Sequence, residues 1–108
     1  EHSNPFNSEY LFLYKITIQN LTTFTVQLLS RKWVITESNG SQRIVEGDGV
    51  VGKQPVIEPG ERYEYVSASA IRTDVGKMVG YYKMQSADGA DLIIPIPEFQ
   101  LVPPFKLN

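Results

Sequence analysis

Large apolar side chains occupy every second position between residues 10 and 18. The set comprises Tyr10, Phe12, Tyr14, Ile16 and Ile18. Alternate side chains of an extended strand point to the same face, whereas a helix would scatter these five around its axis. The stretch therefore predicts a β-strand with one buried face, which a second apolar layer must cover.

Residues 24 to 36 predict a second strand, along which the apolar face changes parity. Before the middle of the segment apolar residues lie at even positions, such as Leu28, and afterwards at odd positions, such as Trp33. A one-residue slip moves every following side chain to the opposite face, so the change predicts a β-bulge between Leu29 and Lys32. We expect Trp33 at the centre of the core.

Turn signals follow roughly every ten to fifteen residues, and no window keeps a helical period. Asn39-Gly40 predicts a hairpin with a type I′ turn, and Asp88-Gly89 predicts the next hairpin. Residues 58 to 61 contain Pro-Gly and predict a tight turn. The pattern favours an all-β fold, an antiparallel β-sandwich or barrel.

Two later positions predict how the strands are placed. Pro95 and Pro97 remove backbone donors from the strand over residues 91 to 97, which favours an edge position. Gly80 lies between Met78 and Tyr82 on an otherwise apolar face, which predicts a close approach of a neighbouring backbone.

Length and composition limit the class of protein. A chain of 108 residues suits one domain. We expect that domain over residues 10–102, after an N-terminal extension at 1–9 that is flexible or a remnant of a longer chain, and before a C-terminal tail at 103–108. The net charge of −2 gives no reason to expect nucleic acid or a membrane as partner. The lack of cysteine favours an intracellular, cytoplasmic setting.

The chain offers few groups for catalysis. Its one histidine is His2 and it has no cysteine, which excludes the usual nucleophile–base pairs and zinc sites. Glu46 and Asp48 are expected to be solvated charges rather than an acid–base pair. We therefore predict no enzyme activity, no catalytic residues, no metal site and no cofactor.

Gly47, Gly49 and Gly52 form the G-x-G-x-x-G pattern of dinucleotide-binding loops. Those loops depend on a helix that starts at the third glycine and presents its N-terminus to the pyrophosphate. Here Lys53-Gln54-Pro55 follows, with Pro59-Gly60 close behind, so no useful helix can begin.

Three interpretations of this loop remain. In the favoured one Gly47 and Gly49 take positive φ, and Val50 and Val51 pin the loop to the sandwich. Backbone amides of such a loop can also bind an anion without a helix. The two acids beside the glycines, Glu46 and Asp48, would repel a phosphate, which Lys53 and Arg43 offset only in part. If Val50 and Val51 point outward, they form a protein-binding surface beside Arg31 and Lys53.

An ordered series of motifs resembles the ApaG domain family over nearly the whole chain, from Tyr10 to Leu101. The residues that carry the resemblance are Ser30-Arg31-Lys32-Trp33-x-Ile35, Gly47-x-Gly49-Val50-Val51-Gly52-x-x-Pro55, Pro59-Gly60, Tyr65-x-Ser67, Gly76-x-Met78-x-Gly80-x-Tyr82-x-Met84 and Ile96-Pro97-x-Phe99-x-Leu101.

This resemblance implies a fibronectin type III-like or immunoglobulin-like β-sandwich without established catalytic residues. It also implies links to protein interaction, to cobalt and magnesium tolerance, and to a proposed nucleotide or pyrophosphate ligand. The sequence departs from the family pattern in two ways. Lys32 replaces the histidine that is usual in the family, and a strand that would precede residues 1–9 is absent. Loss of that strand would expose a sheet edge or leave a groove.

Together these observations predict a non-catalytic binding module, most of all for another protein. The alternative is weak binding of phosphate, nucleotide or pyrophosphate at the loop Gly47–Gly52, linked to divalent metal tolerance. The candidate site residues are Arg31, Gly47, Gly49, Val50, Val51, Gly52 and Lys53.

Overall fold

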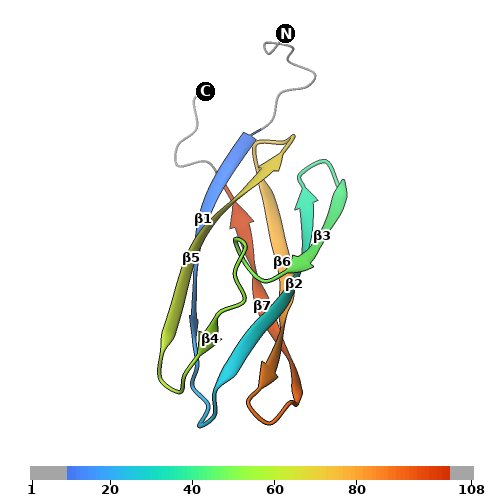
Figure 1. Cartoon of the computed structure of the whole chain (residues 1–108). Coiled ribbons are helices and arrows are strands. Elements are labelled where there is room, and N and C mark those ends of the chain that lie inside the picture. The colour runs from blue at the N-terminus through green and yellow to red at the C-terminus, as the bar shows by residue number, and fades with distance from the viewer. Residues whose placement is uncertain (1–9, 103–108) are drawn as a thin grey trace.

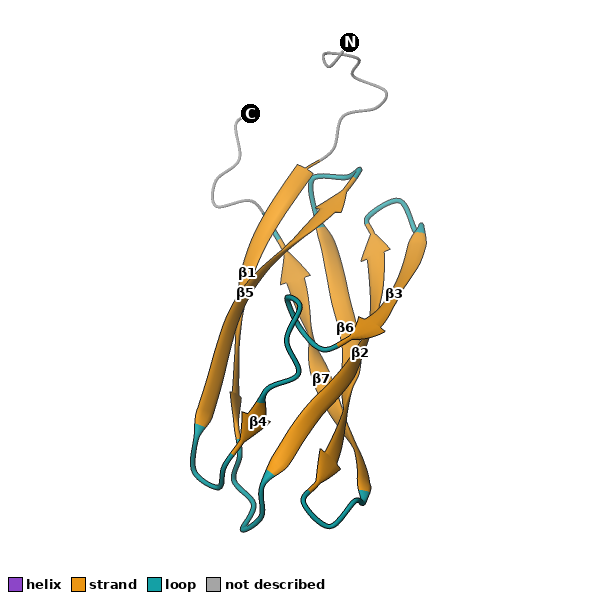
Figure 2. Cartoon of the chain, viewed as in Figure 1, coloured by secondary structure: helices purple, strands orange, loops and turns teal. Residues whose placement is uncertain are grey.

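Seven antiparallel strands form two sheets that face each other (Figure 1). The computed structural model describes residues 10–102, so the expected extension at 1–9 and tail at 103–108 lie outside the described residues. Strands and loops make up this whole part of the chain, without a helix (Figure 2). The strands are β1 (Tyr10–Gln19), β2 (Val26–Glu37), β3 (Gln42–Asp48), β4 (Val56–Ile57), β5 (Arg62–Ile71), β6 (Gly76–Ser86) and β7 (Asp91–Leu101).

The smaller sheet contains β1 and β5, and the larger one has the order β3-β2-β6-β7, with β4 also paired to β2. The fold is the all-β antiparallel sandwich that the alternating pattern predicts. The strand predicted over residues 10 to 18 is β1, whose Phe12 is buried while Leu11 and Leu13 on its other face are exposed. The edge position predicted from the prolines is also confirmed, because β7 closes one side of the larger sheet.

The expected bulge lies in β2, where the register with β6 shifts between Leu28 and Ser30. The extra residue, Leu29, turns the strand so that Leu28, at 0% exposure, and Trp33, at 2%, both face the core. Trp33 is the expected aromatic centre. Its ring meets Tyr14, Tyr82 and Phe99 edge-on, at centroid distances of 6.2, 6.4 and 5.7 Å.

The hairpin after β2 differs from the prediction. Gly40 has a φ of 90°, but Asn39 does not take positive φ, so the turn is not type I′. The amide of Gly40 donates to Glu37 O and the amide of Ser41 donates to the Asn39 side chain, both at 2.9 Å. A three-residue loop of this kind needs a left-handed conformation at one position only, which glycine supplies.

Turn geometry elsewhere agrees with the sequence. Between β4 and β5 the amide of Glu61 donates to Glu58 O at 2.9 Å, and Gly60 takes a φ of 82°, as expected for a tight Pro-Gly turn. The hairpin predicted at Asp88-Gly89 joins β6 to β7, where the amide of Gly89 donates to Ser86 O at 2.9 Å.

The close backbone approach expected at Gly80 is present. A Cβ atom at this position would lie 1.9 Å from the carbonyl oxygen of Lys32 in β2. We expect Gly80→Ala to lower the free energy of unfolding by about 3 kcal/mol, the upper end of the range for overpacked sites. Gly89→Ala is the control, because no atom lies within 4 Å of the added methyl there and only positive φ opposes it, at about 1 kcal/mol. Urea unfolding of the two variants measures the difference, and equal losses would contradict the steric explanation.

Candidate functional site

The glycine loop joins β3 to β4 and lies between β5 and β2 in the view of Figure 1. Both β3 and β4 pair with β2, β3 with Ser30 to Thr36 and β4 with Val26 and Gln27. The loop therefore bridges a gap along one edge of β2. The short strand β4, rather than a helix, follows Gly52, as the sequence predicts. The part of a dinucleotide-binding loop that stabilises a pyrophosphate is thus missing.

The tip of the loop is a closed two-residue turn. The Val50 amide donates to Lys53 O at 2.8 Å, and the Lys53 amide donates to Val50 O at 3.0 Å. Between them Val51 has a φ of 48° and Gly52 a φ of 77°. Positive φ at both central positions is the signature of a type I′ turn. Within residues 10–102, Val51 is the one residue other than glycine with positive φ.

The two valines of the loop point in opposite directions. Val50 is completely buried and packs in the core with Leu28 and Tyr65, whereas 60% of Val51 is exposed. Val50 therefore pins the loop to the sandwich, and Val51 presents an apolar side chain at its surface.

The glycines of the pattern have different roles. Gly49 takes a φ of 62°, and a Cβ there would lie 2.1 Å from Lys53 O, so this position requires glycine. Gly47 does not take positive φ, which corrects the expectation from the sequence. It lies in β3 opposite Arg31, where a Cβ would come within 2.9 Å of the guanidinium. Gly47 thus leaves room for the arginine side chain.

Arg31 holds the loop against the larger sheet. Its Nη1 donates to Gly49 O at 2.8 Å and to Asp48 O at 3.2 Å. Arg31 is therefore close to the glycines, as predicted, but two of its contacts are structural. Lys53 closes the turn through its backbone and is itself exposed.

A groove runs along β5 beside this loop. It consists of two adjoining cavities of about 440 and 170 Å³, which we call the β5 groove. Residues from both sheets line both parts, namely Tyr14, Arg31, Trp33, Ser67 and Ala68. Val51 and Gly52 border one end, and Arg43 borders the other.

Sequence reasoning missed most of this lining. Alternation assigns Tyr14 and Trp33 to the core, but it cannot show that they also reach an opening between the sheets. A run of small residues, Ser67-Ala68-Ser69-Ala70, was an available signal, because small side chains in a strand leave space above it.

Two tyrosines form the polar contact beneath the groove. The hydroxyls of Tyr65 in β5 and Tyr82 in β6 lie 2.5 Å apart and link the two sheets. Burial raises the pKa of both above the ordinary value for tyrosine, and the hydrogen bond from Tyr65 adds to the rise at Tyr82. Both hydroxyls are therefore neutral near pH 7 and act as structural hydrogen-bonding groups.

The loop has little capacity to bind a phosphate. The Gly49 amide donates to Leu29 O at 2.8 Å, and the amides of Val50 and Lys53 bond each other's carbonyls. Only the Val51 and Gly52 amides remain at the tip for a ligand. No group of three or more metal-ligating side chains occurs among the residues described.

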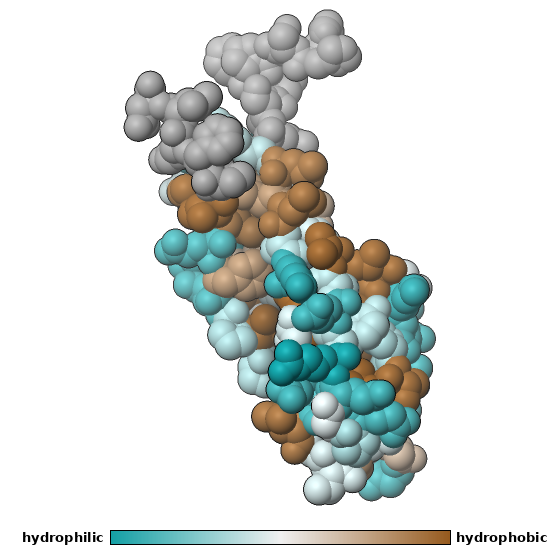
Figure 3. All heavy atoms as spheres, turned by 90° about the vertical axis from the view of Figure 1, so that its left-hand side faces the viewer, coloured by the Kyte–Doolittle hydropathy of each residue, from teal (hydrophilic) through white to brown (hydrophobic). Residues whose placement is uncertain are grey.

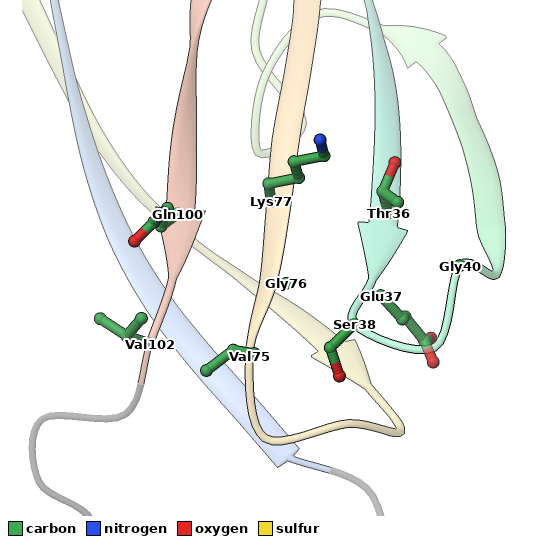
Figure 4. A pocket seen from close by; sticks show the side chains of 9 residues that line it. All are labelled: Thr36, Glu37, Ser38, Gly40, Val75, Gly76, Lys77, Gln100 and Val102. Atoms are coloured by element: carbon green, nitrogen blue, oxygen red, sulfur yellow. The ribbon is translucent and has the colours of Figure 1, made fainter.

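A further cavity of about 480 Å³ lies next to the turns after β2 and before β6. Figure 4 shows that the side chains of Glu37, Lys77 and Gln100 point in different directions around it. Because they do not converge on one point, this cavity is a weaker candidate than the β5 groove.

Gly49 and Gly52 offer a matched comparison, since both take positive φ. We expect Gly52→Ala to cost about 1–2 kcal/mol, because only backbone conformation opposes it. Gly49→Ala should cost about 1–3 kcal/mol more, because the methyl would also meet Lys53 O. Chemical denaturation measures both variants, and similar costs would contradict the role assigned to Gly49.

The buried tyrosines predict a loss of stability in alkali. Their pKa values are raised in the folded protein, so above about pH 10 the unfolded chain releases protons that the folded one retains. The contribution of the two tyrosines to the free energy of unfolding should be constant below about pH 9 and fall as pH rises past 10. The double variant Tyr65→Phe/Tyr82→Phe should show a shallower fall in urea titrations at several pH values. An unchanged slope would argue against this cause.

Comparison with known proteins agrees with the fold. The family model of the ApaG domain matches residues 1–86. Protein ApaG of Vibrio atlanticus is 51% identical over 108 residues, which cover 100% of this chain and 86% of the relative.

A crystal structure of an ApaA protein from Bordetella pertussis superposes with a TM-score of 0.87 at 37% identity, covering 97% of this chain and 85% of that one. The X-ray structure of a structural-genomics target superposes with a TM-score of 0.92 at 40% identity, covering 98% and 80%. In the described part of the chain, no helix has the length and apolarity to cross a membrane. The chain belongs to the ApaG domain family.

Proposed function

We propose that this domain is a non-catalytic module that binds another protein through the β5 groove and the exposed side chain of Val51. The single observation that carries the proposal is the conformation of Val51. A β-branched residue with positive φ is unfavourable for folding by about 1–2 kcal/mol. Type I′ turns favour asparagine or glycine at this position. The valine is thus a poor choice for the turn, and strained positions tend to occur at functional sites.

The surroundings of Val51 support a protein partner. Leu13 is 73% exposed and Val66 57% exposed, and both border the same end of the groove as Val51. In the space-filling view, apolar side chains gather in the upper part of the face formed by β1 and β5 (Figure 3). The aromatic side chains at the floor and the exposed apolar side chains beside them together give the groove an apolar centre of the kind found in protein interfaces.

The alternative of a phosphate, nucleotide or pyrophosphate ligand at Gly47–Gly52 has less support. Most amides of the loop already donate within the protein. The absence of cysteine favours an intracellular partner.

Val51→Asn tests the proposal, because asparagine suits the turn and removes the apolar contact. We expect this variant to be about 1 kcal/mol more stable than the wild type and yet to lose the partner that the wild type captures from extracts of a bacterium with an ApaG protein. Urea unfolding measures stability, and quantitative mass spectrometry of the captured proteins measures binding.

Val79→Asn is the matched control, since it makes the same substitution at a 38% exposed position of β6 in the other sheet. This control should retain the partner. Equal capture by the wild type and Val51→Asn would remove Val51 from the interface. Amide shifts confined to residues 47–53 on addition of sub-millimolar pyrophosphate would favour the alternative instead.

A further inference from the structure

The edge of β5 that faces away from β1 has no strand beside it within residues 10–102. The smaller sheet contains only β1 and β5, so β5 has one paired and one unpaired edge. The unpaired edge borders the β5 groove, because Val66 and Ala68 line it. An open edge of this kind offers backbone donors and acceptors to another chain.

Two hydrogen bonds identify the backbone groups at this edge. Ala70 O accepts from Nη2 of Arg43 in the other sheet at 2.7 Å, so this carbonyl points away from β1. The amide of Asn20, the residue after β1, donates to Glu61 O at 2.9 Å. The backbone N–H and C=O groups of odd-numbered residues in β5 therefore point toward β1. Antiparallel pairing alternates between the two sides, and the N–H and C=O groups of Val66 and Ala68 therefore point into the groove.

This edge lacks the protection found on β7. Proline, charge and bulges usually prevent unwanted strand pairing at sheet edges, and β7 carries Pro95 and Pro97. The segment of β5 from Tyr65 to Ile71 contains neither proline nor a charged residue. Val66 and Ala68 are both exposed. The unprotected edge and the groove coincide.

The charges of the groove indicate what an added strand would carry. Its lining contains the guanidinium groups of Arg31 and Arg43 and a single acidic residue, Asp48. A guanidinium binds a carboxylate with two parallel hydrogen bonds, which favours an acidic side chain in the bound segment. The bond from Arg43 to Ala70 O shows that this edge accepts a donor from across the groove.

We propose that the partner is a protein that presents an extended acidic segment, which adds to the β5 edge as a strand. Main-chain hydrogen bonds to Val66 and Ala68 hold it, and an Asp or Glu side chain reaches Arg31 and Arg43. This inference rests on the proposed protein-binding function and states the form in which the partner is bound. Strand addition of this type obtains affinity from the backbone and specificity from alternate side chains.

Selection of a random dodecapeptide library on the immobilised domain provides a defined probe. We expect enrichment of peptides in which an acidic residue lies within an alternating apolar pattern. In the complex of the wild-type domain with a synthetic enriched peptide, amide hydrogen exchange at Val66 and Ala68 should slow by about tenfold or more. Exchange of the Ser67 amide, which already points toward β1, should change little.

Three variants test the contacts of that peptide. Ala68→Pro removes an edge N–H without affecting the pairing with β1, and should weaken binding by about tenfold or more. Ala68→Thr keeps the N–H and should retain binding. Arg43→Glu should weaken the binding of an acidic peptide by about tenfold or more. Arg43→Gln should weaken it less, because glutamine removes the positive charge without adding a negative one.

The inference is wrong if no peptide is enriched, if exchange at Val66 and Ala68 does not slow, or if the peptide binds Ala68→Pro or Arg43→Glu as well as the wild type. The exchange measurement and Arg43→Glu decide the question even if Ala68→Pro does not fold. If these peptide tests fail but Val51→Asn still loses the captured partner, the proposal of protein binding stands and only strand addition is rejected. Peptide binding at β5 with no effect of Val51→Asn would instead reject the role of Val51.

Discussion

The carbonyl of Leu29 anchors the glycine loop to the bulge in β2. Leu29 is the extra residue of the bulge in β2, and it has no partner in the register with β6. Its oxygen accepts the amide of Gly49 at 2.8 Å and Nε2 of Gln54 at 2.9 Å. One backbone group thus fixes both sides of the glycine loop. It lies at the point where the strand paired to this edge of β2 changes from β3 to β4.

The same bulge explains the spacing of the glycines. After the parity change Arg31 lies on the side of β2 that faces the other sheet, where a charged group needs hydrogen-bond partners. The carbonyls of Asp48 and Gly49 supply them, and the lack of a side chain at Gly47 leaves space for the guanidinium. Gly47 therefore serves an arginine of the protein itself and Gly49 serves the turn closed by Lys53, although the same pattern in a nucleotide-binding loop serves a phosphate. The physical need, close approach to a backbone, is common to both cases.

Much of the fold could be predicted from alternation alone, because alternation reports directly which face of a strand is buried. The parity change between Leu28 and Trp33 located the bulge, and Pro95 and Pro97 located the edge strand. Turn types were less predictable. The hairpin at Asn39 uses its side chain to bind the Ser41 amide, and the type I′ turn formed at Val51-Gly52, where no asparagine or aspartate signals it.

The candidate site could be predicted only in part. Sequence reasoning identified Arg31 and the loop, but the β5 groove depends on which strands of the two sheets lie opposite each other, a relation between residues far apart in the chain. The opposite orientations of Val50 and Val51 were also beyond prediction, since alternation does not apply within a turn.

Two features that are unfavourable for an isolated fold occur side by side in this domain. Val51 adopts a left-handed backbone that opposes folding by about 1–2 kcal/mol, in a protein class whose total stability is about 5–15 kcal/mol. The unprotected edge of β5 adds a risk of aggregation. Both features line the same groove. A chain that bound only small anions would have no use for an exposed valine or an open strand edge, whereas a chain that binds an extended segment of another protein needs both an apolar contact and free backbone groups. Their coincidence is therefore better explained by a protein partner than by the glycine pattern that first suggests a nucleotide.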